Sequence, residues 1–113
     1  MSFLDEYLKY IKENSIEFSK NNVPVLRVPF PSFFGDAIEV FIEKNGSEVT
    51  VHDNGNTLES LLDIGENIYL KNLPFGCVLD GKRIEIKTSS AFVGEAVNTL
   101  IFACLSVCYR WKK

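Results

Sequence analysis

The chain has 113 residues, which is enough for one domain with a single hydrophobic core. Hydrophobic residues make up 46% of it and charged residues 24%, which excludes a disordered or low-complexity chain. The formal net charge of -3 provides no basic field for nucleic acid or anionic lipid. We therefore expect a single domain spanning residues 1–113 whose partners are neither nucleic acid nor membrane.

The cysteines and the N-terminal segment indicate the compartment. The three cysteines, Cys77, Cys104 and Cys108, are an odd number, and residues 1–12 mix charged with apolar side chains rather than forming a secretory leader. A reducing, cytoplasmic location is therefore expected. The apolar stretch from Ala91 to Cys108 contains Glu95, which favours a buried helix over a membrane span.

The N-terminal part predicts a helix followed by a strand. Apolar residues recur every three or four positions from about Phe3 to Phe18, the period of an amphipathic helix. Val23 to Val28 is rich in β-branched residues, which favours a strand. Pro29 and Pro31 follow it and cannot donate to a sheet, so this strand is expected to be short or at an edge.

Two hairpins and two helices are expected in the rest of the chain. Residues 36–43 alternate in polarity, and the Asn-Gly turn at 45–46 returns the chain through residues 48–53. Asn56 or Thr57 caps a short helix that ends near Gly65. A second hairpin turns at Asp80-Gly81, and Ser89 or Ser90 starts a long apolar helix. The predicted fold is α+β, with an antiparallel sheet of four to five strands packed against an N-terminal and a long apolar C-terminal helix.

The densest polar segment of the sequence is the turn Asp53-Asn54-Gly55-Asn56-Thr57, between a strand and a helix. Such a junction exposes backbone N–H groups, and a glycine lets a ligand or partner backbone approach closely. The same residues also suit a purely structural turn with a helix cap. The functional interpretation places this turn outside the core as a binding surface.

The segments around this turn resemble a known family. Val28-Pro29-Phe30, the strand that begins Gly35-Asp36-Ala37-Ile38, and the segment from Val49 to Leu61 with its Asp-Asn-Gly-Asn-Thr-Leu turn are similar to the domain of unknown function 1828. The resemblance implies a small bacterial or phage-associated α+β domain, and it implies no established activity.

Other chemistries remain open as alternatives. Asp53, Glu85 and Lys87 would suit a magnesium-dependent nuclease, in which two carboxylates hold the ion and the lysine stabilises a phosphate. Glu13-Asn14 together with Asp53-Asn54-Gly55 resembles the nucleotide-contacting boxes of the GHKL ATPases, but no glycine-rich lid follows. The other alternative is a small-ligand or nucleotide site that uses the helix start at Thr57.

A zinc site is the remaining candidate. Cys104 and Cys108 are four residues apart, on one face of a helix, and Cys77 and His52 would complete four ligands. They lack the close spacing of structural zinc sites, and buried thiols are the simpler interpretation, so no cofactor is predicted.

The favoured function is a non-enzymatic regulatory or protein-interaction module. Asp53, Asn54, Gly55, Asn56 and Thr57 would contact a protein partner, and Phe30, Phe33 and Phe34 would supply aromatic anchors on a neighbouring rim. A homodimer through the C-terminal helix is also expected, because so small a domain has few surfaces that can cover so apolar a helix.

Overall fold

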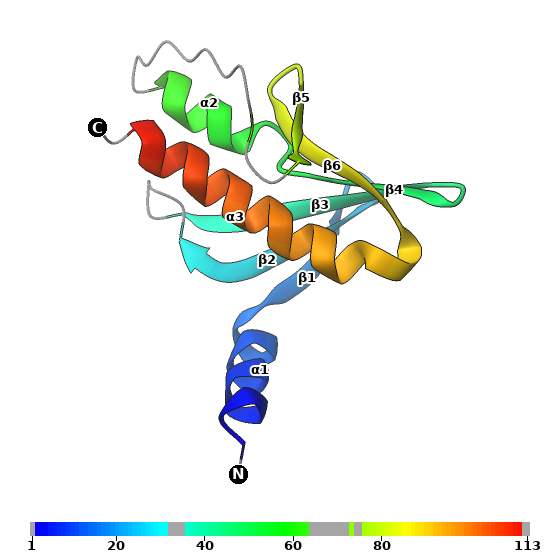
Figure 1. The fold of residues 1–113 in the computed structure, drawn as a ribbon, viewed down its shortest axis with the longest axis vertical. Coiled ribbons are helices and arrows are strands. Elements are labelled where there is room, and N and C mark those ends of the chain that lie inside the picture. The colour runs from blue at the N-terminus through cyan, green and yellow to red at the C-terminus, as the bar shows by residue number, and fades with distance from the viewer. Residues whose placement is uncertain (1, 32–35, 64–72, 74–75, 112–113) are drawn as a thin grey trace.

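A six-stranded antiparallel sheet with strand order β1-β2-β3-β4-β6-β5 forms the body of the protein. The computed structural model describes residues 2–31, 36–63, 73 and 76–111. Helix α3 (Val93–Trp111) lies along one face of the sheet, and α2 (Asn56–Asp63) lies beside the C-terminal end of α3 (Figure 1). Helix α1 (Phe3–Asn14) projects from the body. The predicted α+β class is confirmed, with one strand more than the upper number expected.

The sixth strand comes from the N-terminal segment. Helix α1 ends at Asn14, and strand β1 (Ile16–Lys20) follows it, so the prediction of one helix to Phe18 is wrong. Ser15 has an extended backbone, with φ −102° and ψ 149°, which ends the helix. Its hydroxyl donates to the carbonyl of Ile11 at 2.6 Å and satisfies one of the acceptors that the helix end leaves open.

Two asparagines turn β1 back into β2 (Val23–Pro31). Asn21 and Asn22 have φ of 53° and 66°, the pair of positive values that a tight hairpin turn requires. Asparagine tolerates this left-handed conformation better than other residues with a Cβ atom. Lys20 and Val23 are then paired across the turn. The hairpin was not predicted, because a polar segment such as this one is equally compatible with the end of a helix.

Strand β2 is an internal strand, between β1 and β3, and it is nine residues long. The expectation of a short or edge strand is therefore wrong for β2 as a whole. It holds for the part that carries the prolines, because pairing with β1 ends at Arg27. Pro29 and Pro31 follow that point, and the register with β3 shifts between Arg27 and Pro31. The missing proline N–H groups thus lie where β2 has lost one neighbour or is irregular.

The remaining predicted hairpins are confirmed. Strands β3 (Ala37–Asn45) and β4 (Glu48–His52) pair around Gly46, whose φ is 64°. Strands β5 (Val78–Asp80) and β6 (Arg83–Ser89) form the second hairpin, and β6 also pairs with β4. A short 3-10 helix, η2 (Ser90–Phe92), leads from β6 into α3.

The main core lies between the sheet and α3. Alternate residues of the central strands point toward this helix, as the period of two requires. Its members include Val40, Val51 and Ile84 from the sheet and Leu100, Ala103 and Val107 from α3, all fully buried. The predicted placement of the apolar C-terminal helix against the sheet is therefore confirmed.

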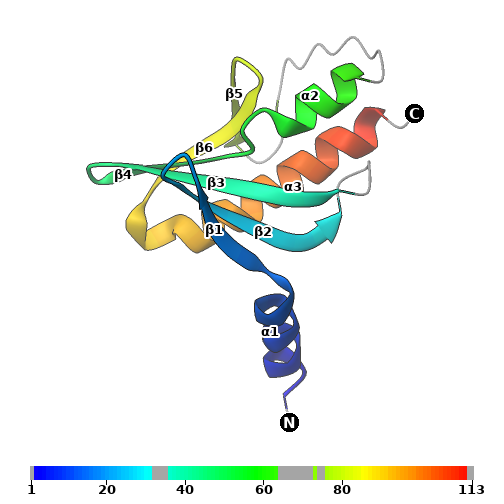
Figure 2. The same ribbon diagram turned by 180° about the vertical axis from the view of Figure 1, so that it is seen from behind.

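The opposite face of the sheet is partly covered by the β1–β2 hairpin. Val25 and Phe41 pair on this face, and His52 pairs with Phe41 and stacks on its ring at a centroid distance of 5.4 Å. All three are buried. Figure 2 shows the β1–β2 turn in front of β3 and β4, and Lys20 and Asn21 from that hairpin line a small cavity together with His52. The sheet is thus apolar on both faces near its centre.

Helix α1 does not pack against the sheet as expected, because it contains no buried residue and extends away from the body (Figure 1). Its apolar residues, which the sequence assigned to the core, are exposed except for the half-buried Ile11.

Candidate functional site

The predicted turn is built around the side chain of Asp53. This residue is only 2% exposed, so the prediction that the acidic corner lies outside the core is wrong for its acidic residue. One carboxylate oxygen accepts hydrogen bonds from the backbone N–H groups of Gly55 and Ile84, both at 2.9 Å. The other accepts the N–H of Thr57 at 3.2 Å and lies 4.0 Å from the Cys104 sulfur. These contacts occupy the carboxylate within the protein.

Asp53 therefore connects the end of strand β4 to the start of helix α2. Its own N–H donates to the carbonyl of Ile84 at 3.2 Å, which extends the β4–β6 ladder by one residue. Its side chain then satisfies the N–H of Gly55 in the turn and the N–H of Thr57 in the first turn of α2, and the second of these bonds is of the kind that an N-terminal cap makes. The strand-to-helix change that the sequence predicted at this position is confirmed, and the carboxylate of Asp53 explains it.

Gly55 is buried rather than presented to a partner. Its φ of 78° is in the left-handed region, and a Cβ atom added there would lie 3.2 Å from the Cβ of Lys82. The glycine is thus needed for backbone conformation and for the close approach of the β5–β6 turn. Asn54 and Asn56 are exposed and Thr57 is half-buried, so only part of the predicted binding segment is accessible.

His52 supports the same turn from the opposite face of the sheet. Its Nδ1 accepts the N–H of Asn54 at 2.9 Å, which identifies Nδ1 as the unprotonated nitrogen. Its Nε2 lies 2.8 Å from a carboxylate oxygen of Glu43. Burial lowers the pKa of His52 and the nearby charge of Arg83 lowers it further, against the attraction of Glu43. The neutral imidazole is therefore favoured, and it holds Asn54 at its φ of 58°.

Glu43 connects His52 to a charged network on this face. Arg83 donates to Glu43 at 2.5 Å and lies 4.0 Å from the buried Glu85. Partial burial by itself raises the pKa of Glu43, but the hydrogen bond from Arg83 and the attraction of His52 and Arg83 outweigh it and lower the pKa. Glu43 is thus held in its ionised form beside the turn.

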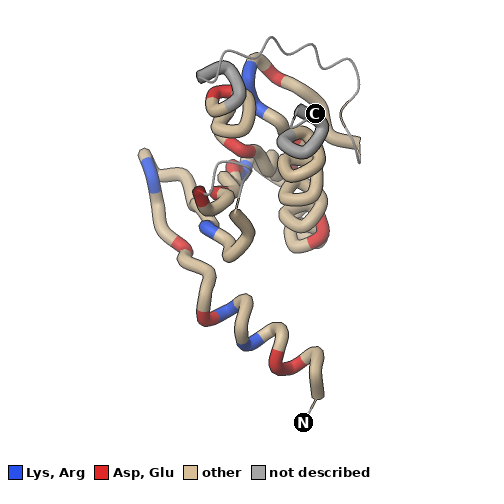
Figure 3. The backbone as a smooth tube through the Cα atoms, turned by 90° about the vertical axis from the view of Figure 1, so that its left-hand side faces the viewer, with Lys and Arg blue, Asp and Glu red and all other residues tan. Residues whose placement is uncertain are grey.

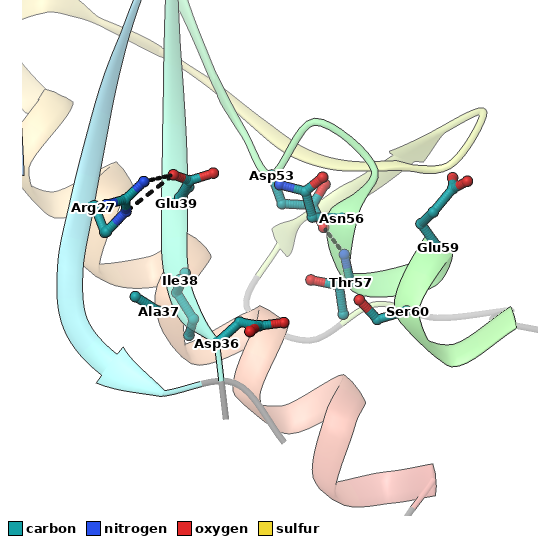
Figure 4. Close-up of a pocket in the computed structure, with 10 residues that line it drawn as sticks. All are labelled: Arg27, Asp36, Ala37, Ile38, Glu39, Asp53, Asn56, Thr57, Glu59 and Ser60. Carbon is teal, nitrogen blue, oxygen red and sulfur yellow. Dashed lines mark hydrogen bonds and ion pairs between the residues drawn. The ribbon is translucent and has the colours of Figure 1, made fainter. Parts of the chain in front are cut away.

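A cleft of about 520 Å³ opens where β4 leaves the sheet. One wall comes from β2 and β3, and the other from the turn and the first residues of α2 (Figure 4). Its lining residues are Arg27, Asp36, Ala37, Ile38, Glu39, Asp53, Asn56, Thr57, Glu59 and Ser60. The volume is within the range of about 300–1,000 Å³ that is typical of ligand sites.

The strand wall of this cleft has an open backbone edge. Pairing between β3 and β4 begins at Phe41, opposite His52. Residues 37–40 of β3 pair only with β2, and in the part of the chain that the structure describes no strand pairs with them on the other side. The gap exists because Asp53 directs the chain into α2 instead of continuing β4. Unpaired edge groups of this kind are a template for another strand.

The cleft is acidic. Four carboxylate side chains and one guanidinium line it. Arg27 donates two hydrogen bonds to one oxygen of Glu39, at 2.8 and 3.1 Å, so these two charges are paired. Glu59 is 3.2 Å from Lys82 in an exposed pair, which is a weak interaction in water. Asp36 is exposed at the mouth and adds to the negative charge (Figure 4).

The aromatic rim is only partly described. Phe30 is half-buried and packs against the main core, so it is not the exposed anchor that was predicted. Phe33 and Phe34 lie outside the described residues, as does Gly65, the expected end of α2.

The alternative catalytic and metal sets do not come together. Asp53 contacts Cys104 on the α3 side of the sheet, whereas Glu85 pairs with His52 and points to the other face, with Lys87 two residues further on the same face. The nuclease arrangement of these three side chains is therefore not formed. His52 and Cys104 are likewise on opposite faces, and among the described residues no group of three or more His, Cys, Asp or Glu side chains could hold a metal ion.

The residues that form the strand wall of the cleft carry little signal in the sequence. Asp36 and Glu39 belong to the alternating segment 36–43, and such alternation is that of any half-exposed strand. The one available signal was the difference in length between the two strands of the hairpin. The first strand extends beyond the point where Asp53 ends its partner, so its first residues must lack a neighbour on that side.

Comparisons with known proteins give no relative: no family model, curated protein or solved structure matches this chain. The resemblance to the domain of unknown function 1828 therefore stays a prediction. The segment Ser90–Val107 is long and apolar enough to cross a membrane, a property that the core helix of a soluble protein shares. In this fold, one side of that helix is buried against the sheet.

Proposed function

We propose that the protein is an interaction module that binds an extended segment of a partner protein in the cleft between β3 and α2. The observation that carries this proposal is the open backbone edge of residues 37–40, which forms one wall of a cleft of about 520 Å³. A peptide in this gap would take the place that β4 leaves when the chain turns at Asp53. The partner's backbone would then hydrogen-bond to β3, which is the strand-addition mode of peptide recognition.

The charge of the cleft specifies the chemistry of the partner. Asp36 and Glu59 are exposed carboxylates on the two walls, and the guanidinium of Arg27 is already bound to Glu39. Lysine or arginine side chains that alternate along an extended segment would meet these carboxylates, whereas an acidic segment would be repelled. An anionic nucleotide is disfavoured for the same reason.

The turn acts indirectly in this proposal. Asp53 and Gly55 are buried and set the position of α2, while Asn56 and Thr57 line the cleft. The functional role of the segment is thus to open the edge of β3 and to provide the opposite wall. No part of this mechanism needs a cofactor or a chemical reaction.

Fluorescence anisotropy with a labelled Lys-Val-Lys-Val-Lys-Val peptide tests the proposal. We expect the basic peptide to bind and a Glu-Val-Glu-Val-Glu-Val peptide not to bind. The variant Ser60→Trp, which fills the cleft, should weaken binding at least about tenfold, or about 1.4 kcal/mol. Ser47→Trp is the matched control, because Ser47 is exposed in the β3–β4 turn and should leave binding unchanged.

A backbone-methylated form of the same basic peptide tests the binding mode, because methylation removes the N–H groups that a strand must donate. Loss of binding on methylation is expected. Equal binding of both peptides, insensitivity to Ser60→Trp, or no binding up to about 1 mM would overturn the proposal.

A further inference from the structure

Helix α1 carries an apolar face that the rest of the chain leaves uncovered. Five of its apolar residues, Phe3, Leu4, Tyr7, Leu8 and Tyr10, are between 53% and 94% exposed, and none of its residues is buried. They lie on one side of the helix, because positions three, four and seven apart share a face. The helix projects from the sheet in both ribbon views, so this face is accessible along its length (Figures 1 and 2).

We infer that this face binds the same helix of a second copy, in antiparallel orientation, and so makes the protein a homodimer. The exposed parts of these five side chains amount to an area on the order of 600 Å² per copy, given about 150–250 Å² for one whole aromatic side chain. Two copies would bury about 1,200 Å², which reaches the size of a specific protein–protein interface. A single isolated chain would leave this area in water.

The charges of α1 favour a second copy in antiparallel orientation. Asp5 and Lys12 are seven residues apart, so they lie on the same flank of the helix, near its opposite ends. In an antiparallel pair, Asp5 of each copy lies near Lys12 of the other, which gives two symmetric opposite-charge pairs. In a parallel two-fold pair, this flank would face the other flank of the partner helix, so Asp5 and Lys12 would not meet. Antiparallel pairing also aligns the two helix dipoles favourably.

The same charges argue against a lipid surface as the occupant. The polar side of α1 carries three acidic residues, Asp5, Glu6 and Glu13, and only two lysines, Lys9 and Lys12. In Figure 3 the two lysines lie between acidic residues near both ends of the helix. A helix that binds anionic lipid instead needs a mainly basic polar face.

Sedimentation velocity from about 1 μM to about 1 mM tests the inference on the whole chain. The wild-type protein should change from monomer to dimer within this range. Leu8→Glu places a charge in the interface and should weaken the dimer at least about a hundredfold. Lys9→Glu is the matched control, since Lys9 is on the opposite side of the helix, and it should change dimerisation less than about threefold. Circular dichroism should show both variants folded, because α1 contributes no buried residue.

A charge-reversal pair tests the orientation. Asp5→Lys and Lys12→Glu should each weaken self-association about tenfold at low salt, because each faces like charges in the partner. An equimolar mixture of these two variants should regain the wild-type affinity, since the mixed dimer restores opposite charges.

Several outcomes would overturn the inference. A wild-type chain that stays monomeric throughout the range would do so, as would a dimer that survives Leu8→Glu but is lost in Phe102→Glu, on the exposed side of α3. Wild-type monomers that instead co-sediment with vesicles of phosphatidylcholine and phosphatidylglycerol would show a lipid surface as the occupant.

Discussion

Replacing Asp53 tests whether this buried side chain organises the turn and the cleft. In Asp53→Ala, the N–H groups of Gly55, Thr57 and Ile84 lose their acceptor. Leaving a buried donor unsatisfied costs about 1–3 kcal/mol. The Thr57 site is part-buried and can admit water, so two donors bear most of the loss. We expect a total destabilisation of about 3–5 kcal/mol, a large part of the stability of an ordinary domain.

The substitution Asp53→Asn separates the loss of the acceptors from the loss of the charge. The amide oxygen can replace the carboxylate oxygen that binds Gly55 and Ile84, whereas the amide nitrogen then faces the Thr57 N–H. One hydrogen bond is lost and two are kept, so we expect a destabilisation of about 1–2 kcal/mol. The order of stability should therefore be wild type, then Asn, then Ala.

Urea denaturation followed by far-ultraviolet circular dichroism measures these free energies of unfolding, with equal denaturant slopes required for the comparison. Asp80→Ala, at an exposed position in the β5–β6 turn, is the control and should change stability by less than about 0.5 kcal/mol. The reasoning fails if Asp53→Ala costs less than about 1 kcal/mol, or if the Asn variant is no more stable than the Ala variant.

Two further predictions concern the same turn. Gly55→Ala should lower the free energy of unfolding more than Gly46→Ala does. Both glycines have positive φ, so the strained backbone should cost about 1–2 kcal/mol at each site. Only Gly55 has a neighbour close to the added Cβ, the Cβ of Lys82 at 3.2 Å, so equal losses in urea denaturation would refute this prediction. The pKa values of His52 and Glu43 are both lowered in the folded protein, so at low pH the unfolded chain binds more protons than the folded one. The free energy of unfolding should therefore fall as the pH falls. The loss begins below about 6.5 for His52 and below about 4.5 for Glu43. His52→Phe should flatten the part of this loss between pH 7 and pH 5, and an unchanged slope in that window would show that another group carries it.

Local sequence patterns determined the elements whose signals are local. The Asn-Gly and Asp-Gly turns positioned two hairpins, and the apolar period positioned α3, because turn chemistry and periodicity act over a few residues. The same patterns located the strand-to-helix change at Asp53. They failed at Ser15 to Asn22, where a polar segment is compatible both with the end of a helix and with a hairpin turn.

The tertiary structure alone decided which distant residues contact one another and which surfaces are buried. Whether Asp53 is buried depends on Ile84 and Cys104, which are 31 and 51 residues away in the chain and supply its hydrogen-bond partners. The cleft likewise depends on two strands of unequal length and on a helix that turns away from them, and no short segment of the sequence encodes that relation. An amphipathic period also cannot say which surface will cover it, so α1 was assigned to the core although its apolar face is exposed.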